Sequence, residues 1–146
     1  MLSTPAALAL IVMAAAGAIW DGKERRIPNR LVALMIAAGF SLNALAYGWE
    51  GVFRSGVGMF LGAGLLVIFY IFGGVEAGDV KFLAAVGAFV GSLNVVVIFI
   101  LASIVAAVMA LIAFARSRRR TGSVTIPYGI AIAGATILVA GLKVVR

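Results

Sequence analysis

The sequence contains neither cysteine nor histidine among its 146 residues. The first absence excludes disulfides, thiolate zinc sites and cysteine nucleophiles, and the second excludes catalytic triads with a histidine base. Acidic residues are also scarce, with five in the chain against 12 basic ones. We therefore expect no metal and no other cofactor, and any acid–base chemistry has to come from a few carboxylates.

Apolar residues dominate the chain. They make up 64% of it, whereas charged residues make up 12%, and the mean hydropathy is +1.21. Six apolar runs follow one another, at about 4–20, 31–47, 52–72, 80–90, 95–115 and 126–145. Since one span takes about 20 residues, we predict an all-α membrane protein, a bundle of about six transmembrane helices forming one domain over residues 1–146. The fourth run is short, so its helix is expected to extend through Asp79 or toward Asn94.

The basic residues are distributed unevenly over the connections between these runs. Nine of the 12 lie in or beside the first, third and fifth connections: Lys23, Arg25, Arg26, Arg30, Lys81, Arg116, Arg118, Arg119 and Arg120. The positive-inside rule places these connections in the cytoplasm and both termini outside. The arginine run at 116–120 is interpreted as an anchor at lipid headgroups. Because the charges lie in loops without a soluble surface, we expect no nucleic-acid partner despite the net charge of +7.

The few carboxylates are the candidates for chemistry. They are Asp21, Glu24, Glu50, Glu76 and Asp79. Asp21 directly follows the first run and Asp79 opens the fourth, so helix packing could bring the two together at the predicted cytoplasmic face. Two carboxylates about 3 Å apart share one proton, so that one can activate water while the other polarises a carbonyl. On spacing alone an alternative stays open, in which Asp21 pairs with Lys23 or Arg25 and Asp79 caps a helix.

Three local sequences resemble the type IV prepilin peptidase family, a group of GxGD-type membrane aspartyl proteases. Residues 21–29 (DGKERRIPN) resemble its first motif, in which an Asp is followed by five residues and Ile-Pro-Asn. Residues 73–87 (GGVEAGDVKFLAAVG) resemble its GxGD segment, and residues 126–131 (IPYGIA) resemble the segment that opens its last helix. The three elements occur in the family's order, and the resemblance extends over essentially the whole chain.

The resemblance implies that Asp21 and Asp79 are the catalytic pair. It further implies site-shaping roles for five neighbours: Glu76, Gly78, Lys81, Pro28 and Asn29. Gly78 would permit a tight approach to Asp79, and a plain helix start would account equally well for Pro28 and Asn29. The chain departs from the family at Glu76, where the GxGD pattern has glycine, which adds a carboxylate and removes backbone freedom. Helix polarity favours the charge on Asp79, near a helix N-terminus, and the proton on Asp21, at a C-terminus.

The resemblance also implies a substrate and a location. The substrate would be a type IV prepilin, with a short leader in the cytoplasm and a hydrophobic helix in the membrane, cleaved at the cytoplasmic face of the bacterial inner membrane. The compact chain resembles the group that serves Flp-type (Tad) pili. Larger members methylate the new N-terminus with a cysteine-containing insertion, so cleavage without methylation is expected here. The oligomeric state is left open.

Two other functions are compatible with the sequence. A catalytically impaired family member would act as a pilus-assembly scaffold, and the departure at Glu76 keeps this alternative open. A small ion-coupled transporter would bind its cation at Asp79 or Glu76. Carriers usually place such a site near the middle of the bilayer, whereas these carboxylates lie at the ends of the apolar runs.

Overall fold

Every regular element in the part of the chain that the structure describes is an α-helix. The computed structural model describes residues 3–24, 27–116 and 128–145. Its helices are α1 (Thr4–Glu24), α2 (Asn29–Ile71), α3 (Ala77–Arg116) and α4 (Tyr128–Val144). The first three are long and apolar enough to cross a membrane. The predicted all-α membrane fold is therefore confirmed.

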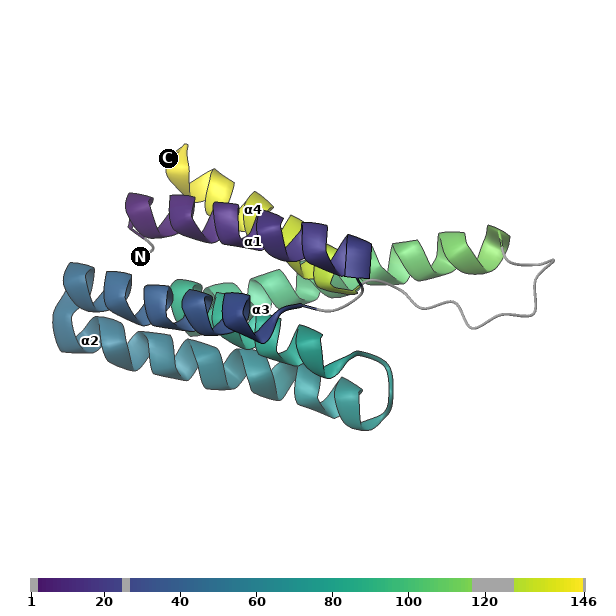
Figure 1. The fold of residues 1–146 in the computed structure, drawn as a ribbon, viewed down its shortest axis with the longest axis horizontal. Coiled ribbons are helices and arrows are strands. Elements are labelled where there is room, and N and C mark those ends of the chain that lie inside the picture. Colours follow the sequence, from purple (N-terminus) through teal and green to yellow (C-terminus); the bar gives the residue numbers. More distant parts are fainter. Residues whose placement is uncertain (1–2, 25–26, 117–127, 146) are drawn as a thin grey trace.

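The structure has four helices where the sequence predicts six, because two of the predicted connections are single-residue breaks. Gly48 interrupts α2 with a φ of 59°, and Gly91 interrupts α3 with a φ of 76°, values that only glycine adopts readily. In Figure 1, α2 turns back on itself at the first break. We call residues 77–90 the inner arm of α3 and residues 92–116 its outer arm. α3 begins at Ala77, so the helix of the short fourth run does extend through Asp79.

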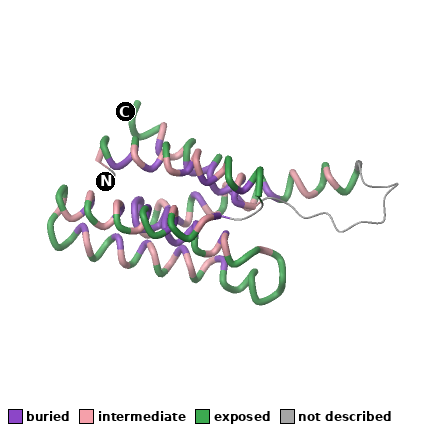
Figure 2. Tube along the Cα trace, in the orientation of Figure 1, coloured by how far each residue is buried: buried purple, intermediate pink, exposed green. Residues whose placement is uncertain are grey.

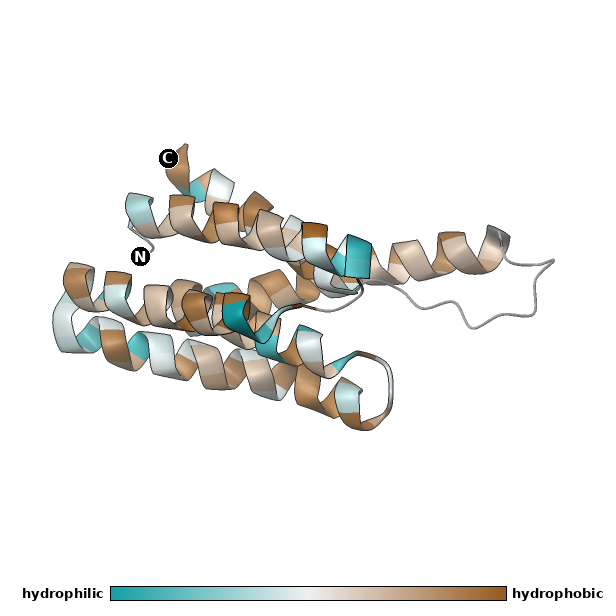
Figure 3. Ribbon diagram, in the orientation of Figure 1, coloured by the Kyte–Doolittle hydropathy of each residue, from teal (hydrophilic) through white to brown (hydrophobic). Residues whose placement is uncertain are grey.

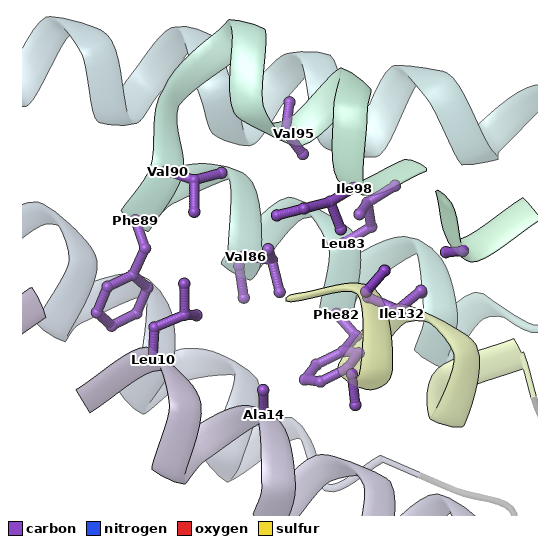
Figure 4. Close-up of a cluster of buried hydrophobic side chains, with 14 of the residues drawn as sticks. Leu10, Ala14, Phe82, Leu83, Val86, Phe89, Val90, Val95, Ile98 and Ile132 are labelled. Atoms are coloured by element: carbon purple, nitrogen blue, oxygen red, sulfur yellow. The ribbon is translucent and has the colours of Figure 1, made fainter. Parts of the chain in front are cut away.

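The inner arm of α3 forms the centre of the molecule. All of its residues from 82 to 90 are buried, as expected of a helix that is apolar on every side. In Figure 4, Phe82, Val86 and Phe89 face Leu10 and Ala14 of α1 and Ile132 of α4. The outer arm returns alongside, so that Ile98 lies next to Leu83 in the same view. Apolar contact on all sides fixes the position of this arm.

The outside of the bundle is apolar as well. Figure 2 shows exposed residues along the outward faces of the helices, and Figure 3 shows that hydrophobic residues occupy much of this surface. Several large side chains are more than two thirds exposed: Leu45, Phe53, Phe60, Phe72, Leu93, Leu111 and Phe114. Such a surface promotes aggregation in water, whereas it matches the hydrocarbon of a bilayer.

The break at Gly48 divides α2 into a first arm (residues 29–47) and a second arm (residues 49–71). Glycines let the second arm of α2 lie directly on the inner arm of α3. A Cβ atom built on Gly58 would run into the carbonyl oxygen of Gly87, and one built on Gly87 would run into that of Gly58. One built on Gly62 would lie 2.6 Å from the carbonyl oxygen of Leu83. This is the close backbone packing that small residues at GxxxG spacing permit in membranes.

A buried asparagine compensates for the break in α3. The amide nitrogen of Asn43 donates to the carbonyl oxygens of Ala88 and Phe89, at 3.0 and 3.1 Å, and to Ser55 Oγ, at 2.9 Å. The break at Gly91 removes the regular helical donors for these two carbonyls. Asn43 therefore donates hydrogen bonds to these carbonyls in place of main-chain N–H groups. It also joins both arms of α2 to the inner arm of α3.

We predict that Gly58→Ala destabilises the protein because the new methyl group forces the two backbones apart. Overpacking of this kind costs about 1–3 kcal/mol, which thermal unfolding of the detergent-solubilised protein would detect. The matched control is Gly64→Ala on the same arm, where a Cβ meets nothing within 4 Å. Equal unfolding temperatures for the two variants would contradict the packing role of Gly58.

We predict that Asn43→Leu also destabilises the protein because it strips the Ala88 and Phe89 carbonyls of their donor. Each buried polar group left without a partner costs about 1–3 kcal/mol. Ser41→Ala, on an exposed position of the same arm, is the control in the same unfolding measurement. A variant at position 43 that is as stable as this control would show that the carbonyls find another partner.

Candidate active site

Four chain segments meet at one end of the bundle. They are the end of α1, the start of α2, the connection between α2 and α3, and the start of α4 (Figure 1). The two termini of the chain and the break at Gly48 lie at the opposite end. Figure 3 shows hydrophilic residues gathered at the end of α1 and the start of α2. Both candidate aspartates belong to this end.

Asp79 is held in the first turn of α3. Its side chain is 6% exposed, and its Oδ2 accepts a hydrogen bond from the backbone N–H of Glu76 at 3.1 Å. In return, the carbonyl oxygen of Glu76 accepts the backbone N–H of Asp79 at 3.0 Å. This reciprocal arrangement is one half of a capping box. Asp79 therefore caps its own helix, as the alternative interpretation of the sequence allowed, and it does so at the wall of a cavity.

Asp21 is held by a different helix from its own. It lies in the last turn of α1, is 6% exposed, and its Oδ2 accepts the backbone N–H of Ile130 at 3.0 Å. That N–H belongs to the first turn of α4, where no helical carbonyl is available to it. A Cβ built on Gly129 would lie 2.7 Å from the same Oδ2. The absence of a side chain at position 129 is what lets Asp21 reach α4.

The two carboxylates are close enough for their charges to interact. Each accepts a main-chain N–H at the start of a helix, Asp79 on α3 and Asp21 on α4. This corrects the expectation that helix polarity distinguishes them, because Asp21 ends α1 and also meets the N-terminus of α4, which favours negative charge. Mutual repulsion opposes the ionisation of both at once. This favours a state in which one member of the pair is protonated and the other is ionised.

A cavity of about 530 Å³ opens beside Asp79. One wall comes from the end of α2 and the following connection, and the other comes from the outer arm of α3 and the start of α4. The lining residues are Phe69, Gly73, Gly74, Val75, Glu76, Asp79, Ser103, Ala106, Ala107, Ala110 and Tyr128. Ser103 Oγ and the Tyr128 hydroxyl share a hydrogen bond of 2.9 Å across the second wall. The volume and the largely apolar lining are typical of a site that binds an organic ligand.

The first two motifs pack against each other on another side of Asp79. Lys81 Nζ donates to Asn29 Oδ1 at 3.3 Å, joining α3 to the start of α2. Pro28 immediately precedes α2, and its carbonyl oxygen accepts the N–H groups of Leu31 and Val32, as at an ordinary helix start. A Cβ on Gly78 would meet the backbone nitrogen of Ile27 at 3.8 Å. This contact is ordinary, so packing against the turn does not itself require glycine at 78.

Glu76 and Lys81 lie at the edge of a second cavity of about 450 Å³. Its lining residues are Glu24, Ile27, Pro28, Asn29, Glu76, Ala77, Gly78 and Lys81. The side chain of Glu76 is exposed, whereas its backbone holds Asp79. Within the described ranges no three carboxylates are grouped so as to hold a metal ion.

Sequence reasoning gave no role to several residues that the structure places at the site. They are Ser103, Tyr128, Gly129 and Ile130. The signal was present for three of these, because Tyr128, Gly129 and Ile130 belong to the third motif. Ser103 carries none, since it is one polar residue in a long apolar run. The arginines at 118–120, Arg25 and Arg26, and the first two residues of the third motif lie outside the described residues.

Comparison with known proteins gives one match. The sequence profile of the type IV leader peptidase family matches residues 8–111, which include both aspartates and the first two motifs. No curated protein and no solved structure matches the chain. Because the matched segment is more than two thirds of the chain, the protein belongs to the type IV leader peptidase family, whose members are aspartic-type peptidases.

Proposed function

We propose that this protein is a membrane aspartyl endopeptidase that removes the leader peptide from type IV prepilins, with Asp21 and Asp79 as its catalytic pair. One observation carries the proposal. Two buried carboxylates from distant parts of the chain interact, each accepts a main-chain N–H at the start of a different helix, and one of them lines a cavity of about 530 Å³. Family membership supports the reaction class, and this geometry supports the two aspartates as the groups that carry it out.

The arrangement supports hydrolysis without a covalent intermediate. The ionised carboxylate of the pair takes a proton from a water molecule, whose oxygen attacks the carbon of the scissile peptide bond. The protonated carboxyl gives its proton to the carbonyl oxygen. The resulting diol collapses when a proton reaches the leaving nitrogen and the C–N bond breaks, leaving a carboxylic acid and a free amine. The main-chain donors from Glu76 and Ile130 keep both carboxylates in place throughout.

The same end of the bundle would face the cytoplasm of a bacterial cell. If each arm of α2 and α3 crosses the inner membrane, the chain makes six passes and both termini lie outside. The position of both termini at one end of the bundle supports this topology (Figure 1), as does the concentration of basic residues in the connections of the other end. A prepilin leader emerging on the cytoplasmic side would then reach the aspartates directly.

The proposed substrates are Flp-type (Tad) prepilins, and the proposed reaction ends at cleavage. The larger family members that methylate the new N-terminus also carry a cysteine-containing insertion. The connections at this end span only 25–28, 72–76 and 117–127, and the sequence has no cysteine. The new N-terminus would therefore leave the enzyme unmethylated.

The position of Glu76 favours a peptidase over an inactive scaffold. Its side chain is exposed and its main chain donates to Asp79, so the residue that departs from the motif still supports the aspartate. The transporter alternative is disfavoured by the location of the carboxylates at one end of the bundle, away from its middle (Figure 1).

The proposal predicts that both aspartates are essential for cleavage. A Flp-type prepilin would be co-expressed with wild type, Asp21→Asn or Asp79→Asn, and leader removal followed by gel shift and mass spectrometry. Wild type should release an unmethylated pilin, and each variant should lose about 10³-fold or more in rate because the pair acts as a unit. Glu50→Gln, at the opposite end, is the control and should retain activity. Cleavage that survives either aspartate change, with the variant properly inserted, would end the two-aspartate mechanism.

The proposal also predicts that Gly129→Ala impairs cleavage without unfolding the protein. The added methyl would lie 2.7 Å from Asp21 Oδ2 and would displace the carboxylate, and small misplacements of catalytic groups cost about 100-fold in rate. Gly134→Ala, on the same helix where a Cβ meets nothing within 4 Å, is the matched control. Wild-type kinetics for Gly129→Ala would show that the position of Asp21 does not depend on this contact.

A further inference from the structure

The cavity beside Asp79 has few groups that can bind a peptide backbone. A peptide in a membrane site needs partners for its own carbonyl and N–H groups. Among the lining side chains, four are polar: Glu76, Asp79, Ser103 and Tyr128. Asp79 belongs to the catalytic pair, and the side chain of Glu76 is exposed. The two hydroxyls are therefore the neutral side-chain donors available to a bound carbonyl.

The backbone of the opposite wall supplies little in their place. The N–H of Gly73 is bonded to the carbonyl oxygen of Tyr70 at 3.0 Å, and that of Gly74 to the carbonyl oxygen of Phe69 at 2.8 Å. The N–H of Glu76 is bonded to Asp79. These three amides are used within the connection itself, and the hydroxyl pair is the neutral side-chain donor site on the cavity walls.

The hydrogen bond between the two hydroxyls uses one of their two protons, so the other can be donated to a ligand. Tyr128 Oη and Ser103 Oγ lie 2.9 Å apart, and either can be the donor. When Ser103 donates to Tyr128, the phenolic proton is left for an acceptor in the cavity. A tyrosine in the first turn of a helix has no preceding helical turn whose carbonyl could accept this proton, so the phenolic proton has no competing acceptor in its own helix. Tyr128 is therefore the better donor to a ligand.

Tyr128 also lines the same cavity as Asp79 and is close along the chain to the residues that contact Asp21. Its side chain is close enough to Asp79 for the charge of that carboxylate to act on it. Along the chain it precedes Gly129 and Ile130, the two residues that hold Asp21. A group bonded to the Tyr128 hydroxyl would thus lie next to the pair that performs the reaction.

We infer that Tyr128 is a substrate-positioning residue whose hydroxyl, oriented by Ser103, donates a hydrogen bond to a backbone carbonyl oxygen of the peptide segment being cleaved. This inference rests on the proposed function, since it assumes that the cavity holds a peptide. It assigns the recognition to the main chain of the substrate and not to one of its side chains. The interaction is available to any apolar segment that enters the cavity.

The test is steady-state cleavage of a purified prepilin by the full-length protein in detergent, with Tyr128→Phe, Ser103→Ala and the double variant. Tyr128→Phe keeps the ring and should lower kcat/KM about tenfold or more, as the loss of an active-site hydrogen-bond donor does. Ser103→Ala should cause a smaller loss. Since Ser103 acts through Tyr128, the double variant should be no worse than Tyr128→Phe alone. Tyr70→Phe, near the same end but outside the lining, is the matched control and should match wild type.

The alternative is that the pair merely ties α4 to the outer arm of α3. In that case the unfolding temperature would fall with activity, and Ser103→Ala and Tyr128→Phe would cause equal losses because each breaks the same hydrogen bond; either result overturns the inference. If Tyr128→Phe does not fold, Ser103→Ala decides, because a normal kcat/KM at normal stability overturns the inference and a lowered one supports it. Asp21→Asn in the same assay separates a failure of the proposed function from a failure of this inference alone. Its activity would overturn the proposed function and with it this inference, whereas an inactive Asp21→Asn beside a fully active Tyr128→Phe overturns the inference alone.

Discussion

A backbone polar group in hydrocarbon has no water to bind, so some other group has to bind the free N–H and C=O groups of a buried helix end. Three buried side chains do so. Asn43 binds the carbonyls left by the break at Gly91, Asp79 binds an N–H at the start of α3, and Asp21 binds one at the start of α4. Two of these three are the proposed catalytic groups. The main-chain N–H groups at the starts of α3 and α4 thus need these carboxylates as acceptors, and they also hold the carboxylates in position for the proposed chemistry.

Much of this architecture is readable from the sequence because it follows from composition and local pattern. The apolar runs correspond closely to the helical arms, and the glycines at GxxxG spacing pack as that spacing indicates. The motifs around Asp21 and Asp79 indicate the family, and the match to its sequence profile confirms it. The helix count differs because Gly48 and Gly91 change the direction of the chain within one residue, and a hydropathy profile does not distinguish such a break from a short loop.

The parts that sequence reasoning missed depend on contacts between distant residues. Asp21 and Ile130 are 109 positions apart, and nothing local indicates that a side chain at the end of α1 completes α4. For that reason helix polarity suggested a distinction between the aspartates that the structure does not support. Ser103 is likewise an unremarked polar residue in an apolar run until the fold places it 2.9 Å from Tyr128. Local motifs therefore indicate which residues are candidates for the chemistry, whereas the contacts of those residues depend on how the helices pack.

The complete enclosure of the inner arm of α3 has a consequence for how the protein is made. Residues 77–90 are shorter than the roughly 20 residues that cross a bilayer on their own, and in the finished molecule residues 82–90 contact other helices and not lipid. This segment is therefore a poor candidate for separate release from a translocon. We expect it to leave the ribosome-bound insertion machinery together with the outer arm, as a helical hairpin that the earlier helices then enclose. Assembly of the active centre would accordingly be a late event in biogenesis, completed only after α4 has been synthesised and has met Asp21.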